Sequence, residues 1–474
     1  MRVTVAGTGY VGTVTGACLA FLGHRVTCID TDEQKIAAFR RGDLPLYEPN
    51  LRELLELIPK GGIDFSSDIA SAVVESDVIF IAVGTPPKPN GEANLIYLET
   101  VARSIGAAMD DTKFRVVVNK STVPVGSGNL VEALVREGVR ETNPAIEKRI
   151  TFAVASNPEF LREGCAIGDS LYPDRIVVGA EDDHCYDVLQ ALYERVVHQT
   201  FTPPPFLPRK EEQGDVPMVM TTLTSAEMIK YASNAFLATK IGFANEIANI
   251  CERVGADSKE VMAGIGLDSR IGAQFLNAGI GWGGSCFGKD ISSLLHTARD
   301  YGYQARMLEA SIEVNRAQRH IVVQKLLEKL FILKGRTIAL LGLAFKPDTD
   351  DLRDAPSLQI AERLLQMGAR IKAYDPVAME ACRAQHPELN IQYAASVREA
   401  AIDADALVVV TDWAEFRDLP LKEISQLMSH AVIVDGRNMF DPEEAKRAGF
   451  EYTGVGRREK SGRRSVTATV VSSV

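Results

Sequence analysis

Residues 2–30 read RVTVAGTGYVGTVTGACLAFLGHRVTCID, and the fold of the first part of the chain follows from them. Their apolar pattern predicts a strand, a glycine-rich turn, a helix that ends at Gly23, and a second strand. The turn has the spacing GxGxxG: Gly7 permits a tight turn, Gly9 lets a pyrophosphate approach the backbone, and Gly12 lets helix and strand pack closely. Because a helix N-terminus offers free N–H groups to phosphate, the stretch predicts a dinucleotide site.

An acidic residue ends the second predicted strand. Asp30 lies 18 residues after Gly12, where a carboxylate can accept hydrogen bonds from both hydroxyls of an adenosine ribose. The carboxylate would repel a 2′-phosphate, and although Lys35 is near, the next three residues contain no arginine to reverse this preference. We therefore predict that the helix start at Tyr10 and Val11, together with Asp30, binds NAD rather than NADP. The alternative is a plain βαβ unit with a glycine-rich turn.

Strand and helix patterns continue to alternate after this unit. Buried-strand runs occur at 78–83, 115–119, 151–155 and 175–178, with helical patterns between them. This alternation predicts a parallel, doubly wound sheet. Five prolines and a charged patch in residues 202–217 then predict a surface loop.

A helical section and a second α/β pattern follow the loop. Residues 223–330 show helical periodicity with almost no strand signal, and residues 311–330 predict one long connecting helix. The order strand, turn, helix, strand, Asp recurs at 337–375. The predicted fold class is α/β, with two Rossmann-like doubly wound parallel-sheet domains joined by a central helical segment with a long connecting helix. The predicted divisions are 1–205 (NAD-binding), 218–330 (central helical), 331–456 (second Rossmann-like) and 457–474 (disordered tail).

Length, charge and cysteine pattern exclude several classes of protein. At 474 residues the chain is too long for one hydrophobic core. A formal net charge of -11 opposes nucleic-acid binding, because phosphates favour a basic surface. No N-terminal signal is recognisable, and no apolar stretch approaches the roughly 20 residues of a membrane helix. We expect a cytoplasmic protein that binds neither nucleic acid nor membrane. The seven scattered cysteines contain no CxxC pair, which argues against a disulfide framework and a metal site.

One cysteine stands in unusual surroundings. Residues 279–290 read GIGWGGSCFGKD, and an apolar helical pattern follows them. Ser285 is a good N-cap, so we expect Cys286 in the first helical turn, where the positive end of the dipole would lower the pKa of its thiol. Asp290 lies four residues on, on the same helical face. The alternative is a small buried residue beside a glycine-rich turn.

Two further segments carry candidate chemistry. Lys230 and Asn234 share one helical face among small and apolar residues, so a desolvated Lys230 with a lowered pKa could move protons or hold an oxyanion. The alternative is a solvated helix lysine. Glu159 follows a buried strand at the edge where such sheets bind ligands, and it is a candidate general base or an ordinary loop acid.

Six motifs together resemble a known family, the UDP-glucose 6-dehydrogenases, and the resemblance extends from Met1 to about Gly456. In this family, UDP-glucose is oxidised twice at C6 to UDP-glucuronate with two NADH. An aldehyde has no second hydride to give until a nucleophile makes it tetrahedral, and a thiolate supplies this. The motifs are GIGWGGSCFGKD (279–290), SAEMIKYASNAF (225–236), KSTVPVG (120–126), SNPEFLREG (156–164), LAFKPDTDDLRDAPS (343–357) and DGRN (435–438).

The resemblance implies a role for each candidate. Cys286 would add to the aldehyde as a thiohemiacetal that becomes a thioester, and Lys230 with Asn234 would steady the oxyanion. Proton and water handling is implied for Lys230, Asp290, Glu159 and Thr122. The implied UDP-glucose residues are Glu159, Phe160, Leu161, Arg162, Lys230, Asn234, Arg270, Phe275, Gly281, Phe287, Phe345, Lys346 and Arg437. For NAD, Lys35, Thr85, Ser121, Thr122 and Lys289 join Gly7, Gly9, Tyr10, Val11, Gly12 and Asp30.

We also expect a homodimer through the central helices, and the resemblance implies that the dimer partner contributes Arg270. Two alternatives stay open: a dehydrogenase of GDP-mannose or UDP-N-acetylmannosamine, and a non-catalytic sensor of NAD or a sugar nucleotide. A sensor would have no need of Cys286, Lys230 and Asp290. The chain departs from the family at Gly288, where a larger residue is expected, and in the length of the 202–217 loop.

Overall fold

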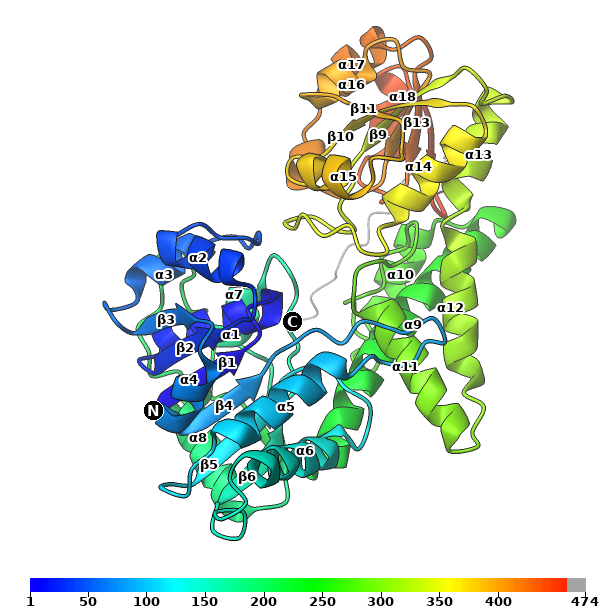
Figure 1. The fold of residues 1–474 in the computed structure, drawn as a ribbon. Coiled ribbons are helices and arrows are strands. Elements are labelled where there is room, and N and C mark those ends of the chain that lie inside the picture. The colour runs from blue at the N-terminus through cyan, green and yellow to red at the C-terminus, as the bar shows by residue number, and fades with distance from the viewer. Residues whose placement is uncertain (458–474) are drawn as a thin grey trace, which may run out of the picture. The chain divides into compact units, whose positions relative to one another are not determined.

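The computed structural model describes residues 1–457, so the predicted disordered tail lies, apart from its first residue, outside the described residues. The chain divides into two compact units (Figure 1). The first comprises Met1–Phe236 and Ser285–Leu308, and the second comprises Leu237–Gly284 and Glu309–Val474. The chain therefore passes from the first unit to the second twice.

The first unit is built on an eight-stranded sheet with the order β3-β2-β1-β4-β5-β6-β7-β8. Strands β1 to β6 pair in parallel, as predicted, whereas β7 pairs antiparallel with β6 and β8 pairs in parallel with β7. Strand β8 was not predicted, because only half-buried and exposed residues form it. The strands are β1 (Arg2–Ala6), β2 (Arg25–Ile29), β3 (Ile63–Ser66), β4 (Val78–Ile81), β5 (Arg115–Asn119), β6 (Phe152–Ser156), β7 (Ile176–Ala180) and β8 (Met218–Thr221).

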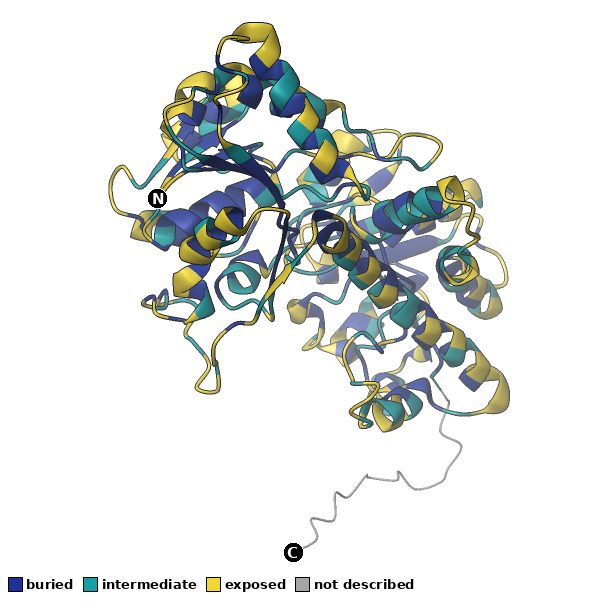
Figure 2. Cartoon of the chain, turned by 90° about the horizontal axis from the view of Figure 1, so that it is seen from below, coloured by how far each residue is buried: buried dark blue, intermediate teal, exposed yellow. Residues whose placement is uncertain are grey.

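Helices cover both faces of this sheet, and the central strands are consequently buried on both sides. One apolar core includes residues of α1 and α8, and the other includes residues of α5 and α6. Figure 2 shows the pattern, with dark blue strands and helices whose outer faces are yellow. The helices are α1 (Tyr10–Phe21), α2 (Glu33–Arg41), α3 (Leu51–Leu57), α4 (Ile69–Glu75), α5 (Ile96–Ala108), α6 (Ser127–Thr142), α7 (Ala166–Leu171) and α8 (Asp183–Val197).

The section between the sheets is helical, as predicted. Its longest element is α9, with 32 residues. The single helix predicted over 311–330 is wrong, because α12 ends at Gln318 and α13 begins at Ile321. Between them, buried Arg319 donates hydrogen bonds to Asp354 and to the Trp282 carbonyl, and the backbone bonding is interrupted there. The helices are α9 (Leu223–Val254), α10 (Ser258–Gly266), α11 (Phe287–Asp300), α12 (Arg306–Gln318) and α13 (Ile321–Leu330).

The second unit contains a six-stranded sheet with the order β11-β10-β9-β12-β13-β14, and all its strands pair in parallel. The predicted fold class is thereby confirmed. The strands are β9 (Thr337–Leu341), β10 (Arg370–Tyr374), β11 (Ile391–Tyr393), β12 (Ala406–Val409), β13 (Val432–Asp435) and β14 (Glu451–Gly454). The helices around the sheet are α14 (Pro356–Gln366), α15 (Met379–Gln385), α16 (Val397–Ala401), η1 (Ala414–Phe416), α17 (Leu421–Leu427) and α18 (Pro442–Arg447).

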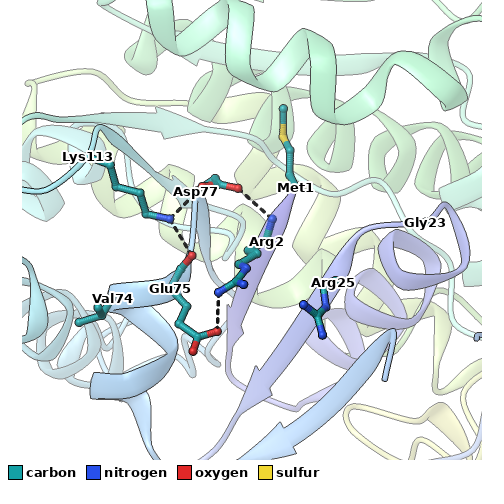
Figure 3. Close-up of a pocket in the computed structure, with 8 residues that line it drawn as sticks. All are labelled: Met1, Arg2, Gly23, Arg25, Val74, Glu75, Asp77 and Lys113. Atoms are coloured by element: carbon teal, nitrogen blue, oxygen red, sulfur yellow. Dashed lines mark hydrogen bonds and ion pairs between the residues drawn. The ribbon is translucent and has the colours of Figure 1, made fainter. Parts of the chain in front are cut away.

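An open hollow of about 540 Å³ lies where β1 and β2 begin (Figure 3). Arg2 and Lys113 form ion pairs in it with Glu75 and Asp77. Doubly wound sheets bind their ligands at the opposite edge, beyond the carboxyl ends of the strands. We therefore place the functional site elsewhere. Among the described residues, no helix is both long and apolar enough to cross a membrane.

Candidate active site

Four strands of the first sheet end side by side, and most of the predicted cofactor residues follow these ends. Ala6 of β1 is in register with Ile81 of β4, Ile81 with Asn119 of β5, and Asn119 with Ser156 of β6. Parallel pairing thus brings together loops that are more than a hundred residues apart in the chain. These loops contain Gly7, Gly9, Thr85, Ser121, Thr122 and Glu159.

The glycine-rich turn has the shape that a pyrophosphate requires. Gly7 has φ +103°, and a Cβ atom on Gly12 would lie 1.8 Å from the Gly7 carbonyl oxygen, so both positions exclude side chains. A Cβ on Gly9 would meet no atom within 4 Å, which leaves open space at the start of α1. Because this helix start has no side-chain cap, its N–H groups are available to a phosphate. The turn therefore fits a dinucleotide.

Asp30 is held as a carboxylate beside this turn. Its Oδ2 accepts hydrogen bonds from the Thr8 backbone (3.0 Å) and hydroxyl (2.6 Å), and the Lys35 Nζ lies 3.2 Å away. Burial raises the pKa of Asp30, but the Thr8 bonds, the Asp32 N–H and Lys35 together hold it below its ordinary value. The predicted cofactor residues Asp30 and Lys35 are therefore neighbours and form an ion pair.

Two other predicted cofactor loops are tied together. The Thr85 hydroxyl donates to the Thr122 carbonyl at 2.7 Å, and the Ser121 hydroxyl donates to the Val83 carbonyl at 2.7 Å. These two bonds connect the loop after β4 to the loop after β5. Tyr10 differs from its predicted neighbours, because its hydroxyl donates to the Glu48 carboxylate and accepts a bond from the Gly164 N–H.

Asp30 makes the preference for NAD testable. We expect kcat/KM with NADP to be at least about 10-fold below that with NAD, because a 2′-phosphate would meet a fixed carboxylate. Asp30→Ala should reduce the difference in kcat/KM between NAD and NADP, since Lys35 would lose its partner and could attract the 2′-phosphate. Initial rates with both cofactors measure this. Equal use of the two by the unaltered protein would show that Asp30 does not select the ribose.

Lys230 and Glu159 form a buried ion pair in the first unit. The Lys230 Nζ lies 2.8 Å from Glu159 Oε1, and their side chains are 5% and 7% exposed. Glu159 Oε2 accepts the Leu161 N–H at 2.6 Å. Burial opposes both charges, but the attraction prevails: the pKa of Glu159 is lowered and that of Lys230 is raised. The expectation of a lowered Lys230 pKa is wrong, because its paired carboxylate could not be seen in the sequence.

A second acid and its partners adjoin this pair. Asp290 is buried, and its carboxylate accepts from Asn234 Nδ2 at 2.6 Å and from Lys289 Nζ at 2.5 Å. The Asp290 charge also raises the pKa of Lys230. Side chains of α9 and of the start of α11 thus meet at Asp290. Lys289, predicted as a cofactor residue, is engaged with Asp290.

Cys286 lies next to these charged groups, but its environment differs from the prediction. It is itself the N-cap of α11, so the expected N-cap at Ser285 is wrong. The thiol is solvent-exposed, yet desolvation by the surrounding protein raises its pKa. The charges of Glu159 and Asp290 raise it further, whereas Lys230 lowers it. The expected lowering of the pKa by the helix dipole is also wrong, because desolvation, together with the two carboxylates, outweighs Lys230 and the Ser285 hydroxyl.

Buried groups that sequence reasoning passed over hold this arrangement. Glu227 lies one helical turn before Lys230 and accepts the N–H groups of Gly126 (2.6 Å) and Gly128 (2.8 Å). Burial raises the pKa of Glu227 to about 7. Glu227 thereby joins the start of α6 to the part of α9 that contains Lys230. A glutamate amid apolar residues was the only signal for it. Glu48 similarly accepts the N–H groups of the 164–166 segment.

The predicted substrate residues fall into two groups, and one of them lies in the second unit. Arg437 follows β13, and its guanidinium donates to the Val410 carbonyl at 2.7 Å and to those of Gly281 and Phe345 at 3.3 and 3.4 Å. Burial lowers its pKa. The Lys346 Nζ lies 5.7 Å from the centroid of the Phe345 ring. Three separate segments thus present two cations and an aromatic ring, which suits a nucleotide diphosphate.

Other predicted substrate residues are placed differently. Arg270 is exposed and bonds to its neighbour Asp268, and Arg162 likewise bonds to Asp169. Phe275 has a positive φ of 63° in the second unit. Leu161 packs against the first core, and Phe287 opens α11. In the second unit, the bonds that the structure shows for the Arg270 side chain thus go to Asp268 and to no other predicted substrate residue.

Three family models match the chain in order. The NAD binding domain of the UDP-glucose/GDP-mannose dehydrogenase family matches residues 1–197, the central domain matches 224–317, and the UDP binding domain matches 339–442. The chain belongs to the UDP-glucose/GDP-mannose dehydrogenase family. It is therefore an NAD-dependent oxidoreductase, and the predicted family and cofactor are confirmed.

Individual relatives in the family cover nearly the whole chain. UDP-glucose 6-dehydrogenase TuaD of Bacillus subtilis is 47% identical over 96% of the chain and 93% of its own length. A UDP-glucose 6-dehydrogenase of Rhizobium meliloti is 44% identical over 96% of the chain and 100% of its own length. Among solved structures, a UDP-glucose dehydrogenase from Pyrobaculum islandicum aligns with a TM-score of 0.84 and 37% identity, over 96% of this chain and 97% of that one.

Proposed function

We propose that the protein is a UDP-glucose 6-dehydrogenase that oxidises UDP-glucose to UDP-glucuronate in two steps. The observation that carries this is the convergence of Cys286, Lys230, Asn234, Asp290 and Glu159 within one unit. A single oxidation of an alcohol needs only a base and a hydride acceptor, whereas a second oxidation needs a nucleophile. Relatives that are 40–47% identical and are named UDP-glucose 6-dehydrogenases support the choice of sugar.

Bound NAD, held by the glycine turn, Asp30 and the Thr85 and Ser121 loops, would accept a hydride at each oxidation. At each oxidation the C6 hydroxyl would give its proton to Glu159, and the ammonium of Lys230 and the amide of Asn234 would stabilise the negative charge on the C6 oxygen. Because the pKa of Cys286 is raised, its proton leaves only as the sulfur attacks the aldehyde. We assign Glu159 as the acceptor of that proton, since it is the carboxylate with the larger influence on the thiol.

The covalent intermediate is formed on the protein itself. The sulfur of Cys286 bonds to C6 and gives a thiohemiacetal, whose oxidation gives a thioester. Water then attacks the thioester carbon, the C–S bond breaks, and the thiolate leaves with the acid as product. The Thr122 hydroxyl would orient this water, and the Asp290 carboxylate would take its proton. Each of these steps uses a side chain of the first unit.

The substrate would also need its nucleotide held. We propose that Phe345, Lys346, Arg437, Gly281 and Phe275 bind UDP, while the segment Glu159–Arg162 and Phe287 contact the sugar. The division of the chain follows from this: residues 1–205 bind NAD, 218–330 supply the central helices, and 331–456 bind the UDP-sugar.

We also propose a cytoplasmic homodimer that pairs through α9. Phe236, Phe243 and Ile250 are seven residues apart and are 67%, 49% and 48% exposed, and Val254 is 70% exposed. Residues at this spacing lie on one helical face, and such a stripe favours another apolar surface over water. A second copy offers the same stripe. The partner's copy would then bring Arg270 to the site, and a monomeric mass in solution would contradict this.

The stoichiometry of NADH tests the proposed function. With limiting UDP-glucose and excess NAD, we expect two NADH per sugar by absorbance, because the thioester route completes both oxidations before release. One NADH with free aldehyde would refute it. GDP-mannose and UDP-N-acetylmannosamine serve as comparison substrates and should turn over more slowly. Binding of UDP-glucose without any NADH would favour the sensor.

A further inference from the structure

A small, partly open cavity adjoins Glu159 in the first unit. Its volume is about 70 Å³, and most of its lining is apolar, but Glu159, Lys120, Asn157 and Tyr193 also line it. A water molecule needs on the order of 10–15 Å³ of such space and two to four polar partners. The cavity therefore has room for several water molecules, and these four side chains offer them hydrogen-bond partners.

Hydrogen bonds fix the orientation of Lys120 at this cavity. Asn157 Oδ1 accepts from the Lys120 Nζ at 3.0 Å and from the Tyr193 hydroxyl at 2.6 Å, while its Nδ2 donates to the Val177 carbonyl at 2.7 Å. The amide is thus oriented by two partners besides Lys120. Because Asn157 is buried, the lysine amine has one defined position on the cavity wall.

Burial lets Lys120 lose its proton close to neutral pH. Burial lowers its pKa to about 8, the nearby Glu159 raises it, and Lys230 lowers it. The other titratable groups in the cavity lining are Cys18, Asp169, Arg175 and Tyr193. At neutral pH, Lys120 can therefore both carry and release a proton, as a freely solvated lysine cannot.

The cavity also extends to partly exposed residues. Ser170 and Arg175 belong to its lining, and both are partly exposed. The Arg175 guanidinium lies 3.7 Å, and the Lys230 Nζ 5.4 Å, from the centroid of the Phe160 ring. Lys230 and the cavity are thus separated by little more than Glu159 and Phe160. Solvent can reach the wall of the active site from this side.

The proposed reaction requires a connection between the active site and solvent. One alcohol, two NAD⁺ and one water become one carboxylate, two NADH and three protons, so both charge and hydrogen balance. A site covered by a sugar nucleotide and a dinucleotide must still admit one water and discharge three protons. A wet cavity behind the acceptor carboxylate would provide that route.

We propose that Lys120, acting through water in this cavity, relays protons from Glu159 to solvent during each turnover. Lys120 does not touch the reacting atoms, so it is a positioning and relay residue rather than a catalytic one. A proton that Glu159 receives passes to a cavity water, and that water passes a proton to the neutral Lys120 amine. The amine releases it toward Ser170 and Arg175. This inference rests on the proposed function.

The test compares Lys120→Met and Lys120→Arg with the unaltered protein and with Lys113→Met, which alters a lysine in the hollow at the other edge of the sheet. In the unaltered protein and in Lys113→Met, kcat should rise with pH through about 8, because Lys120 accepts a proton only when neutral. Lys120→Met should lower kcat about 10²-fold and lose this rise. Lys120→Arg keeps a charge and a donor but cannot lose its proton, so it should lose the rise as well.

Other readouts separate the relay from a structural role. KM for UDP-glucose and for NAD should change less than about 3-fold, and a pH indicator should show proton release lagging behind NADH. Ser170→Leu narrows the cavity but keeps Lys120, and it should give the same lag of proton release behind NADH formation. If Lys120→Met does not fold, this variant tests the relay in its place. Unchanged pH profiles and proton release in the variants would overturn the relay. Absence of NADH in the unaltered protein would instead overturn the proposed function.

Discussion

Cys286→Ser is expected to lose at least about 10³-fold in kcat for the formation of UDP-glucuronate, while NAD binding changes by less than about 2-fold. The serine hydroxyl has a far higher pKa than the thiol, so it cannot form the covalent adduct at neutral pH. The first oxidation does not need the sulfur, and up to one NADH per site should appear together with aldehyde. Stopped-flow absorbance and titration of NAD fluorescence quenching measure the two quantities.

The matched control is Cys165→Ser, because Cys165 is the other exposed cysteine of the chain and lies outside the charged cluster. It should retain full activity. Full turnover in Cys286→Ser would remove the thioester from the proposed reaction. Mass spectrometry of a quenched reaction should find the sugar nucleotide attached to the unaltered protein and not to the variant.

Lys230→Met is expected to cost about 3–5 kcal/mol of unfolding free energy, because it leaves the Glu159 carboxylate buried and unpaired. Both side chains are almost wholly buried, so solvent screening reduces this little. The apparent midpoint of thermal unfolding should fall by roughly 6 °C or more. Activity should also be lost, since the ammonium that stabilises the oxyanion is gone.

The sign of the pH dependence follows from the two pKa shifts. The pKa of Glu159 is lowered, so its contribution is present above its unfolded value of 4.5 and is lost as pH falls through its folded pKa. The pKa of Lys230 is raised, so its contribution is present below 10.5 and is lost as pH rises through its folded pKa. The deficit of Lys230→Met should therefore be greatest near neutral pH and shrink in acid.

A double-mutant cycle with Glu159→Gln isolates the pair. If the ion pair is responsible, Lys230→Met together with Glu159→Gln should be more stable than the sum of the single changes implies. Strict additivity would mean that the pair contributes nothing. Lys240→Met is the control on the same helix, because Lys240 bonds only to the backbone carbonyls of Ile271 and Gly272 among the partners that the structure shows, and no buried carboxylate would be stranded.

The local sequence pattern predicted features whose residues lie within one segment of the chain, but not features that depend on distant partners. The glycine turn with Asp30 was predictable, because all its determinants lie within one βαβ unit. The buried strands could be predicted, β7 included, but neither the antiparallel direction of β7 nor the half-exposed strand β8 is marked by a distinctive sequence pattern. The direction of a pKa shift depends on partners far away in sequence. Thus Cys286 and Lys230 were expected to shift the wrong way, as Glu159 reaches them only through the fold.

Two buried residues were missed for a related reason. Lys120 and Glu227 lie in segments whose neighbours were recognised, but only the structure shows their hydrogen bonds to Asn157 and to the glycines of the 126–128 segment. Burial decides whether a lysine or a glutamate is an ordinary surface group. That property emerges when separate strands and helices meet.

The carboxylate of Glu48 limits which substitutions the sequence can tolerate at positions 10 and 48. It accepts hydrogen bonds from the Tyr10 hydroxyl, beside the glycine turn, and from the backbone of Gly164 and Ala166, beyond the Glu159 loop. Replacing the tyrosine by phenylalanine would leave a buried acceptor short of a donor, at a cost of about 1–3 kcal/mol. Replacing the glutamate alone would leave the Ala166 N–H and the tyrosine hydroxyl without their acceptor, while the Gly164 N–H would keep its bond to that hydroxyl. Substitutions at Tyr10 and Glu48 should therefore be tolerated only when both residues change together.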